Sequence, residues 1–157
     1  MNELFQIFRA MMRDELRALR LGDTAVVTAT APHAEGDTHN HACDISLRHG
    51  GLALTRVPIA TPHVGWVSPP RVGDIVLLTY VDGDVNRPVI TGRLYSDVAP
   101  PPVHADDELW ISMPPEHRTQ IAFKKDGSLL IAAGKTTITV AQDGAVALVG
   151  ETDLQIT

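Results

Sequence analysis

The sequence predicts a mainly β protein with three parts: an N-terminal helix, a small barrel of short strands and a repetitive β tail. Apolar residues recur every three or four positions from residue 2 to residue 21, and from Asp23 onward they recur at every second position. Short runs rich in β-branched residues then alternate with glycine, proline and aspartate, as strands and turns do. Beyond residue 124 the turn signal Asp-Gly occurs twice, 17 residues apart, so one unit is written twice.

The N-terminal segment, residues 1–22, is expected to be one amphipathic helix. Three arginines, Arg9, Arg13 and Arg17, lie away from its apolar stripe, and Gly22 suits the left-handed position after the last turn. Such a helix either covers its own domain or docks onto another protein. The stripe supplies the candidate docking residues, which are Phe5, Phe8, Met12, Leu16 and Leu19.

Residues 23–98 are expected to form the barrel. Five short strands without a second helix predict a closed or nearly closed Greek-key barrel of the oligonucleotide/oligosaccharide-binding (OB) type. A sandwich of five or six strands is the alternative. The last two strands form a hairpin with the polar tip Asp82–Arg87. The expected strands are residues 24–31, 38–48, 52–59, 75–81 and 88–95.

A proline run, Pro100–Pro102, marks the clearest boundary, because consecutive prolines impose extended backbone. It opens a Pro-rich neck, residues 99–124, with two short strands on either side of Pro114 and Pro115. The repeated unit fills residues 125–157, and each copy reads as two short strands separated by glycine turns.

A short ladder of this kind leaves strand edges open and buries little on its own. The sequence therefore predicts an intertwined triple-stranded β-helix, in which each chain pairs its edges with those of two further copies in a homotrimer. Rigidity comes from this pairing and from an apolar axis. The candidate inward-facing residues of the trimer core are Leu130, Ile138, Val140, Leu148, Leu154 and Ile156.

The composition argues against several classes of protein. A net charge of −6 and a pI of about 5.5 make nucleic acid an unexpected main partner, because phosphate binding needs a basic surface. The single cysteine, Cys43, allows no intrachain disulfide. No signal-peptide core is present, and no apolar run approaches the roughly 18 residues of a membrane span, so we expect synthesis in the cytoplasm.

Three motifs suggest chemistry that their context does not support. His39, His41 and Cys43 alternate, so they share one side of a strand and could bind zinc or iron, but a polar strand face with a buried thiol explains them better. Gly134-Lys135-Thr136 lacks the first glycine and the helix of a phosphate-binding loop. Asp82, Asp84 and Asn86 have calcium-loop spacing without the required glycine or glutamate. We expect no cofactor and no enzymatic activity.

The hairpin carries a family resemblance. Residues Val72–Tyr95 read V-G-D-I-V-L-L-T-Y-V-D-G-D-V-N-R-P-V-I-T-G-R-L-Y. This stretch resembles the OB domain of phage baseplate assembly protein V and of the type VI secretion valine-glycine repeat spike, and Trp66–Pro69 fits the same pattern. The matching residues are Gly73, Asp74, Asp84, Arg87, Pro88, Val89, Gly92, Arg93 and Tyr95.

The resemblance implies a homotrimeric central spike at the tip of a contractile tail, beneath a hub that continues the tail tube. Its partners are then tail hub and baseplate proteins, and its β-helix makes transient contact with the target membrane. The chain has no room for a muramidase domain and no His-x-His apex for iron, so we expect a blunt end or a separate PAAR-type tip protein. Phage, tailocin and secretion system remain open.

A second hypothesis is a monomeric OB module that binds single-stranded nucleic acid or an oligosaccharide. It needs aromatic stacking platforms and a basic barrel face. Only Trp66, Tyr80 and Tyr95 are available in the barrel segment, and the repetitive tail has no role in such a module.

Overall fold

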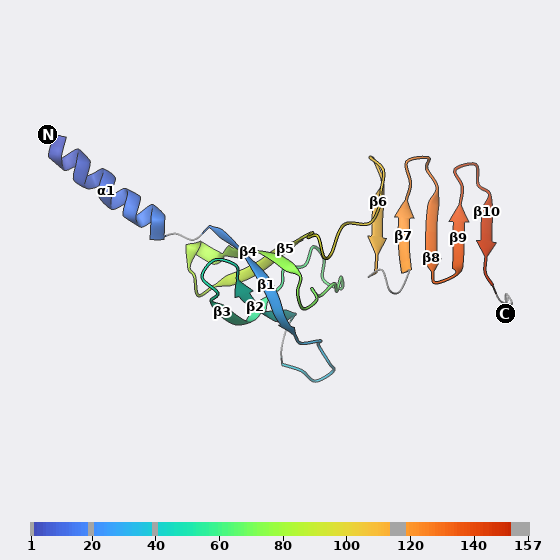
Figure 1. Ribbon diagram of the computed structural model, residues 1–157, viewed down its shortest axis with the longest axis horizontal. Coiled ribbons are helices and arrows are strands. Elements are labelled where there is room, and N and C mark those ends of the chain that lie inside the picture. Colours follow the sequence, from blue (N-terminus) through green and yellow to red (C-terminus); the bar gives the residue numbers. More distant parts are fainter. Residues whose placement is uncertain (1, 19–20, 39–40, 114–118, 152–157) are drawn as a thin grey trace. The chain divides into compact units, whose positions relative to one another are not determined.

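The computed structural model describes residues 2–18, 21–38, 41–113 and 119–151, and it divides the chain into two compact units, Met1–Pro100 and Pro101–Thr157 (Figure 1). The division falls inside the proline run. The first unit contains α1 (Asn2–Ala18), β1 (Gly22–Thr30), β2 (Ala42–Leu47), β3 (Ala53–Pro58), β4 (Ile75–Tyr80), the 3-10 turn η1 (Val81–Gly83) and β5 (Pro88–Leu94). The second unit contains β6 (Leu109–Ser112), β7 (Thr119–Phe123), β8 (Leu129–Ala133), β9 (Thr136–Val140) and β10 (Val146–Val149).

Helix α1 is amphipathic, as its spacing predicts. Every side chain from residue 4 to residue 14 is exposed in the single chain, including Phe5, Phe8 and Met12 on the apolar stripe. Of the other two predicted docking residues, the Leu16 side chain and the whole of Leu19 lie outside the described residues.

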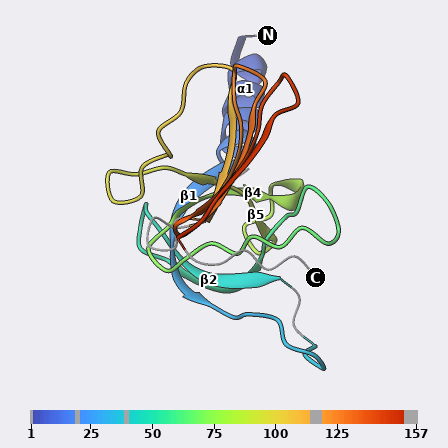
Figure 2. The same cartoon turned by 90° about the vertical axis from the view of Figure 1, so that its right-hand side faces the viewer.

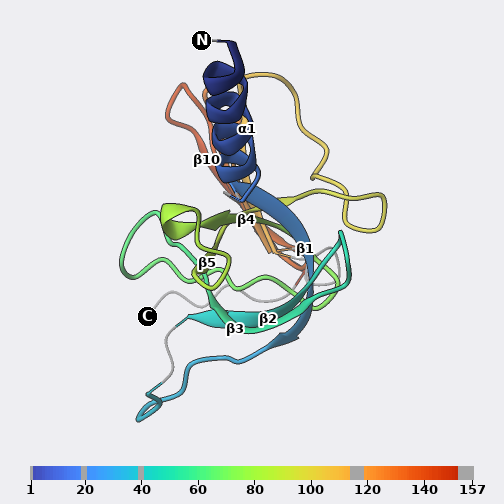
Figure 3. The same ribbon diagram turned by 90° about the vertical axis from the view of Figure 1, so that its left-hand side faces the viewer.

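The five strands of the first unit curl into a small barrel, seen in Figure 3. They pair antiparallel in the order β3-β2-β1-β4-β5. A parallel bridge between Ile59 and Ile90 joins the two ends of this order, and the Ala60 N–H donates to the Ile90 carbonyl at 2.8 Å. The predicted strands are all present, and the arrangement is consistent with an OB-type barrel rather than a sandwich.

The barrel core follows from alternation along the strands. In β2, buried and half-buried residues alternate, so every second side chain points inward. Aliphatic residues fill the interior, in line with the low aromatic content of 4%. The fully enclosed members are Ala25, Val27, Cys43, Ile45, Leu47, Val57, Val76, Leu78 and Ile90.

The second unit is a single antiparallel layer, seen nearly edge-on in Figure 2. Its strands pair in chain order from β6 to β10, so β7, β8 and β9 have both edges paired inside the same chain. The sequence analysis assigned the pairing partners of these strand edges to other copies. In the structure, neighbouring strands of the same chain pair with them. The strands β6 and β7, which the sequence places in a neck, are the first two strands of this layer.

The sequence repeat is also a structural repeat. In the first copy the Lys124 N–H donates to the Ser128 carbonyl at 2.9 Å, and in the second the Ala141 N–H donates to the Ala145 carbonyl at 2.8 Å. Asp126 and Asp143 close these turns by accepting a backbone N–H two residues onward, at 2.9 and 3.0 Å. Both Asp-Gly signals therefore form the same hairpin turn.

Candidate functional site

One face of the second unit's sheet is strongly apolar. Residues directly opposite each other in an antiparallel ladder share a face, so the pairing defines rows across all five strands. Two adjacent rows on this face consist entirely of large apolar residues, and we call them the apolar rows. They are Leu109–Phe123–Leu129–Val140–Val146 and Ile111–Ile121–Ile131–Ile138–Leu148, and we call the second the central row because Thr119–Ala133–Thr136 lies on its other side.

The opposite face of the same sheet is less apolar, and we call it the polar face. One of its rows is Trp110–Ala122–Leu130–Thr139–Ala147 and the next is Ser112–Gln120–Ala132–Thr137–Val149. Seven of these ten residues are serine, threonine, glutamine or alanine, and the three larger apolar ones are Trp110, Leu130 and Val149. The sheet is therefore amphipathic across its thickness.

The predicted trimer-core residues divide between these two faces. Ile138, Val140 and Leu148 lie in the apolar rows, whereas Leu130 lies on the polar face beside Ala122 and Thr139. Leu154 and Ile156 lie outside the described residues. The sequence analysis did not select Ile111, Ile121 and Ile131, the other isoleucines of the central row; the alternation of apolar residues at 109, 111, 121 and 123 was a signal for the first two.

Much of the apolar rows remains exposed in the single chain. Leu109 is 58% exposed, Phe123 50% and Leu148 45%. Burying this much hydrocarbon is favourable by roughly 25 cal/mol per Å². The sheet therefore has a large unrealised driving force for association through this face.

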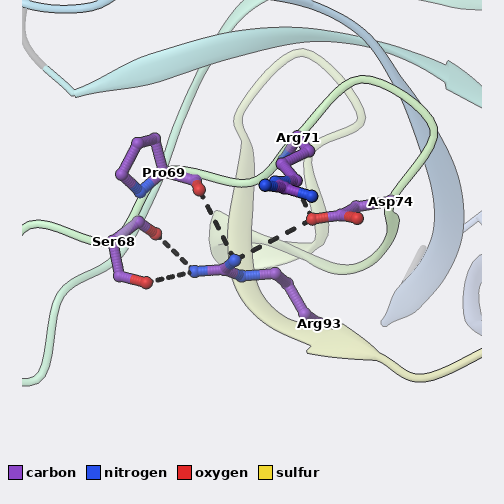
Figure 4. Close-up of polar contacts among 5 residues, drawn as sticks. All are labelled: Ser68, Pro69, Arg71, Asp74 and Arg93. Carbon is purple, nitrogen blue, oxygen red and sulfur yellow. Dashed lines mark hydrogen bonds and ion pairs between the residues drawn. The ribbon is translucent and has the colours of Figure 1, made fainter. Parts of the chain in front are cut away.

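A second cluster lies in the barrel and accounts for several of the family-like residues. Figure 4 shows the guanidinium of Arg93 between Ser68 and Pro69 on one side and Asp74 on the other. It donates to the Ser68 carbonyl and hydroxyl and, at 3.4 Å, to the Pro69 carbonyl. Its nearest approach to the Asp74 carboxylate is 3.8 Å. We call this arrangement the Arg93 clasp.

The clasp holds the segment between β3 and β4 against β5. Asp74 also accepts the Arg71 N–H at 2.8 Å, which closes the turn that leads into β4. Gly73 occupies this turn with φ +95°, a conformation that L side chains rarely adopt. Gly73, Asp74 and Arg93 thus have architectural roles.

We predict that Arg93→Ala loosens the segment of residues 60–72. The side chain is 40% exposed, so the loss in unfolding free energy is discounted to about 1–2 kcal/mol. Hydrogen exchange should rise in this segment, and Arg93→Lys should restore it only in part because an ammonium group lacks the planar fork. Arg87→Ala, which removes the exposed ion pair to Asp82, is the matched control. Unchanged exchange in Arg93→Ala would count against the clasp.

The structure describes only part of the predicted metal-binding face. Cys43 is 2% exposed in the barrel core, His41 is half-buried, and His39 lies outside the described residues. Among the residues that the structure describes, no three His, Cys, Asp or Glu side chains are grouped to hold a metal ion. Burial, reinforced by the nearby Asp44 carboxylate, raises the pKa of the Cys43 thiol to about 11.

This pKa predicts an unreactive thiol. At pH 8 iodoacetamide should leave Cys43 unmodified in the folded protein and alkylate it once urea unfolds the chain, because the thiolate is the reactive form. Mass spectrometry measures the alkylation, and rapid labelling of the native protein would contradict the burial.

The raised pKa of Cys43 also favours the protonated thiol in the folded state. Above pH 9 the free energy of unfolding should therefore fall, because the thiol of the unfolded chain ionises first.

The other two motifs form turns. At the hairpin tip Asp82 pairs with Arg87 at 2.6 Å, and Asp84 accepts the Asn86 N–H at 2.9 Å, so both carboxylates already have partners. Gly134 and Lys135 join β8 to β9, with Gly134 at φ +61° in a two-residue turn. Strand β9, not a helix, follows this glycine, as the sequence analysis expects.

The barrel also carries a hollow of about 270 Å³ at the seam where Ile59 meets Ile90. His41, Trp66 and Arg93 are among its lining residues. Its described lining contains hydroxyl groups, one histidine and one arginine, but no carboxylate. The guanidinium in this lining is already bonded in the clasp.

In the described part of the chain, no helix combines the length and the apolar character that crossing a membrane requires. Residues 48–95 match the model of a family described as the type VI secretion system/phage-baseplate injector OB domain. The matched segment includes strands β3, β4 and β5 and every residue of the Arg93 clasp. It confirms the resemblance identified from the hairpin.

Proposed function

We propose, from the injector OB domain that residues 48–95 carry, that this chain is a structural component of a phage baseplate or a related contractile injection machine, where it serves as the central spike. Within such a machine a spike plugs the tube beneath the hub and transmits the force of sheath contraction to a small area of the target envelope. The role requires a stiff assembly and no reaction chemistry.

The observation that carries this proposal is the amphipathic sheet of the second unit. A single layer with two wholly apolar rows on one face is poorly stable in water, and contiguous exposed apolar patches often mark association sites. Three copies that direct their apolar rows toward a common axis form a closed column with the polar faces outside. We therefore propose a homotrimer with Ile138, Val140 and Leu148 in its core.

The exposed stripe of α1 is proposed as the hub-docking element. Phe5, Phe8 and Met12 are each more than half exposed, which is costly for a helix that remains in water. Baseplate proteins are the proposed partners, a PAAR-type protein is the proposed tip partner, and contact with the target membrane is proposed to be transient. Assembly places the chain in a phage or injection particle.

The alternative, a monomeric nucleic-acid or sugar module, has less support. Tyr80 is 6% exposed and is unavailable for stacking, while Trp66 and Tyr95 are exposed. Arg93 and Arg87 are both engaged with protein groups. A salt-dependent shift of the purified protein by single-stranded DNA would favour this alternative.

Deleting the gene in the producing cell tests the spike proposal. We expect contractile particles to be absent or inactive, and wild-type chain supplied in trans to restore them. Electron microscopy counts the particles, and a killing or delivery assay measures their activity. Fully active particles assembled without this chain would refute the proposal.

A further inference from the structure

The turns of the second unit restrict how several copies can combine. Between β7 and β8, and again between β9 and β10, the same hydrogen-bonded Asp-Gly turn reverses the chain. Between β8 and β9 only Gly134 and Lys135 separate the two strands. Turns this tight return the chain beside the strand just completed. At none of the three can the chain pass to a different sheet.

The edges of the inner strands of this sheet are already paired within the chain. Strand β8 pairs with β7 through Ile121–Ile131 and with β9 through Ile131–Ile138. Strands β7 and β9 likewise have a chain neighbour on each side, and the described ladder leaves open only the outer edges of β6 and β10. The backbone groups of β7, β8 and β9 are therefore not available for pairing with a second copy. A second copy can contact these strands through the side chains of the apolar face.

The chemistry of this face favours another copy of the same chain as its occupant. Five strands of four or five residues give a face of roughly 24 by 15 Å, or on the order of 350 Å², and apolar patches of a few hundred Å² are often functional surfaces. The two apolar rows contain no charge and no hydrogen-bonding side chain that could select an unlike partner. Four isoleucines and one leucine form the central row, and three identical aliphatic rows can pack around a common axis without leaving a polar group unpaired.

We infer that, in the trimer on which this inference rests, each chain forms one complete wall of the spike. The three walls meet through their apolar rows, and the strands of different chains are not interlaced within β7–β9. This replaces the interchain ladder with side-chain packing as the source of cohesion. The spike then assembles from sheets that are already folded.

A cysteine pair across β9 and β10 tests this arrangement. Thr139 and Ala147 lie directly opposite each other on the polar face, away from the proposed core. In a Cys43→Ala background we expect Thr139→Cys/Ala147→Cys to form a disulfide within each chain on mild oxidation. A denaturing, non-reducing gel should then show a single-chain band with no free thiol.

The possible outcomes separate the inference from the proposed function. A native trimer whose disulfides join different chains into covalent dimers and trimers would overturn the wall arrangement and leave the spike proposal intact. A native monomer would overturn the trimer and the inference with it. A double variant that keeps both thiols free would contradict the β9–β10 pairing on which the inference depends.

Single cysteines provide a matched second test. Ile131→Cys places a thiol in the central apolar row, so the three walls should bring its copies together and oxidation should yield covalent dimers. Leu130→Cys, its neighbour on the polar face, should yield none under the same conditions. Crosslinking at position 130 without crosslinking at 131 would contradict the inference.

Discussion

Replacing Leu148 with aspartate should reduce the assembly to single chains. Leu148 ends the central apolar row and pairs with Ile138, so in the proposed trimer an aspartate there places three carboxylates in an apolar column. Burying an unpaired charge costs at least about 3 kcal/mol per chain, and the cost recurs in every copy. Light scattering at micromolar concentration should give the mass of one chain.

The matched control is Ala147→Asp. Ala147 is the neighbouring residue on the same strand and is exposed on the polar face, so the substitution introduces the same side chain into β10 and changes the net charge equally. We expect this variant to retain the mass of the wild-type protein. A fully trimeric Leu148→Asp protein would count strongly against the proposed core.

The second large effect is expected inside the barrel. Leu78 is 0% exposed, and its pairing opposite Ile90 places it where β4 meets β5. Leu78→Ala should lower the unfolding free energy by about 3 kcal/mol, because the lost transfer energy is joined by a cavity that close-packed neighbours fill only in part. For a barrel of this size the midpoint temperature should fall by roughly 12–24 °C.

Leu77→Ala provides the comparison for this measurement. Leu77 precedes Leu78 on the same strand but is 40% exposed on the outer surface, so its truncation should cost less than about 1 kcal/mol. Thermal unfolding is best followed by Trp66 fluorescence in a Trp110→Phe background, so that only the barrel reports. Equal effects of the two substitutions would show that the barrel interior is not packed as described.

Sequence alone predicted the elements well because each has a strong local signal. Residues 2–18 carry the period of a helix, and β9 alternates in the letters T-T-I-T-V, so the placement of Ile138 and Val140 on one face follows directly. The barrel strands are likewise bounded by glycine, proline and aspartate. Turn chemistry identified the two Asp-Gly hairpins for the same reason.

The remaining features depend on distant partners that no local pattern specifies. Strand β8 begins L-L-I, with three apolar residues in a row. Its own sequence therefore does not show which residues lie on the apolar face, and the pairing with β7 and β9 determines this. The Arg93 clasp joins residues 25 positions apart. The sequence analysis recognised that the edges of the short strands in the tail need pairing partners. It could not show that neighbouring strands of the same chain provide them.

Solution mass tests the central claim most directly. The account predicts that the purified chain, 16.9 kDa by sequence, has three times that mass in light scattering and keeps it on dilution into the nanomolar range. A stable, folded species with the mass of one chain would show that the apolar rows have no partner copies, and the spike proposal would then have to be abandoned.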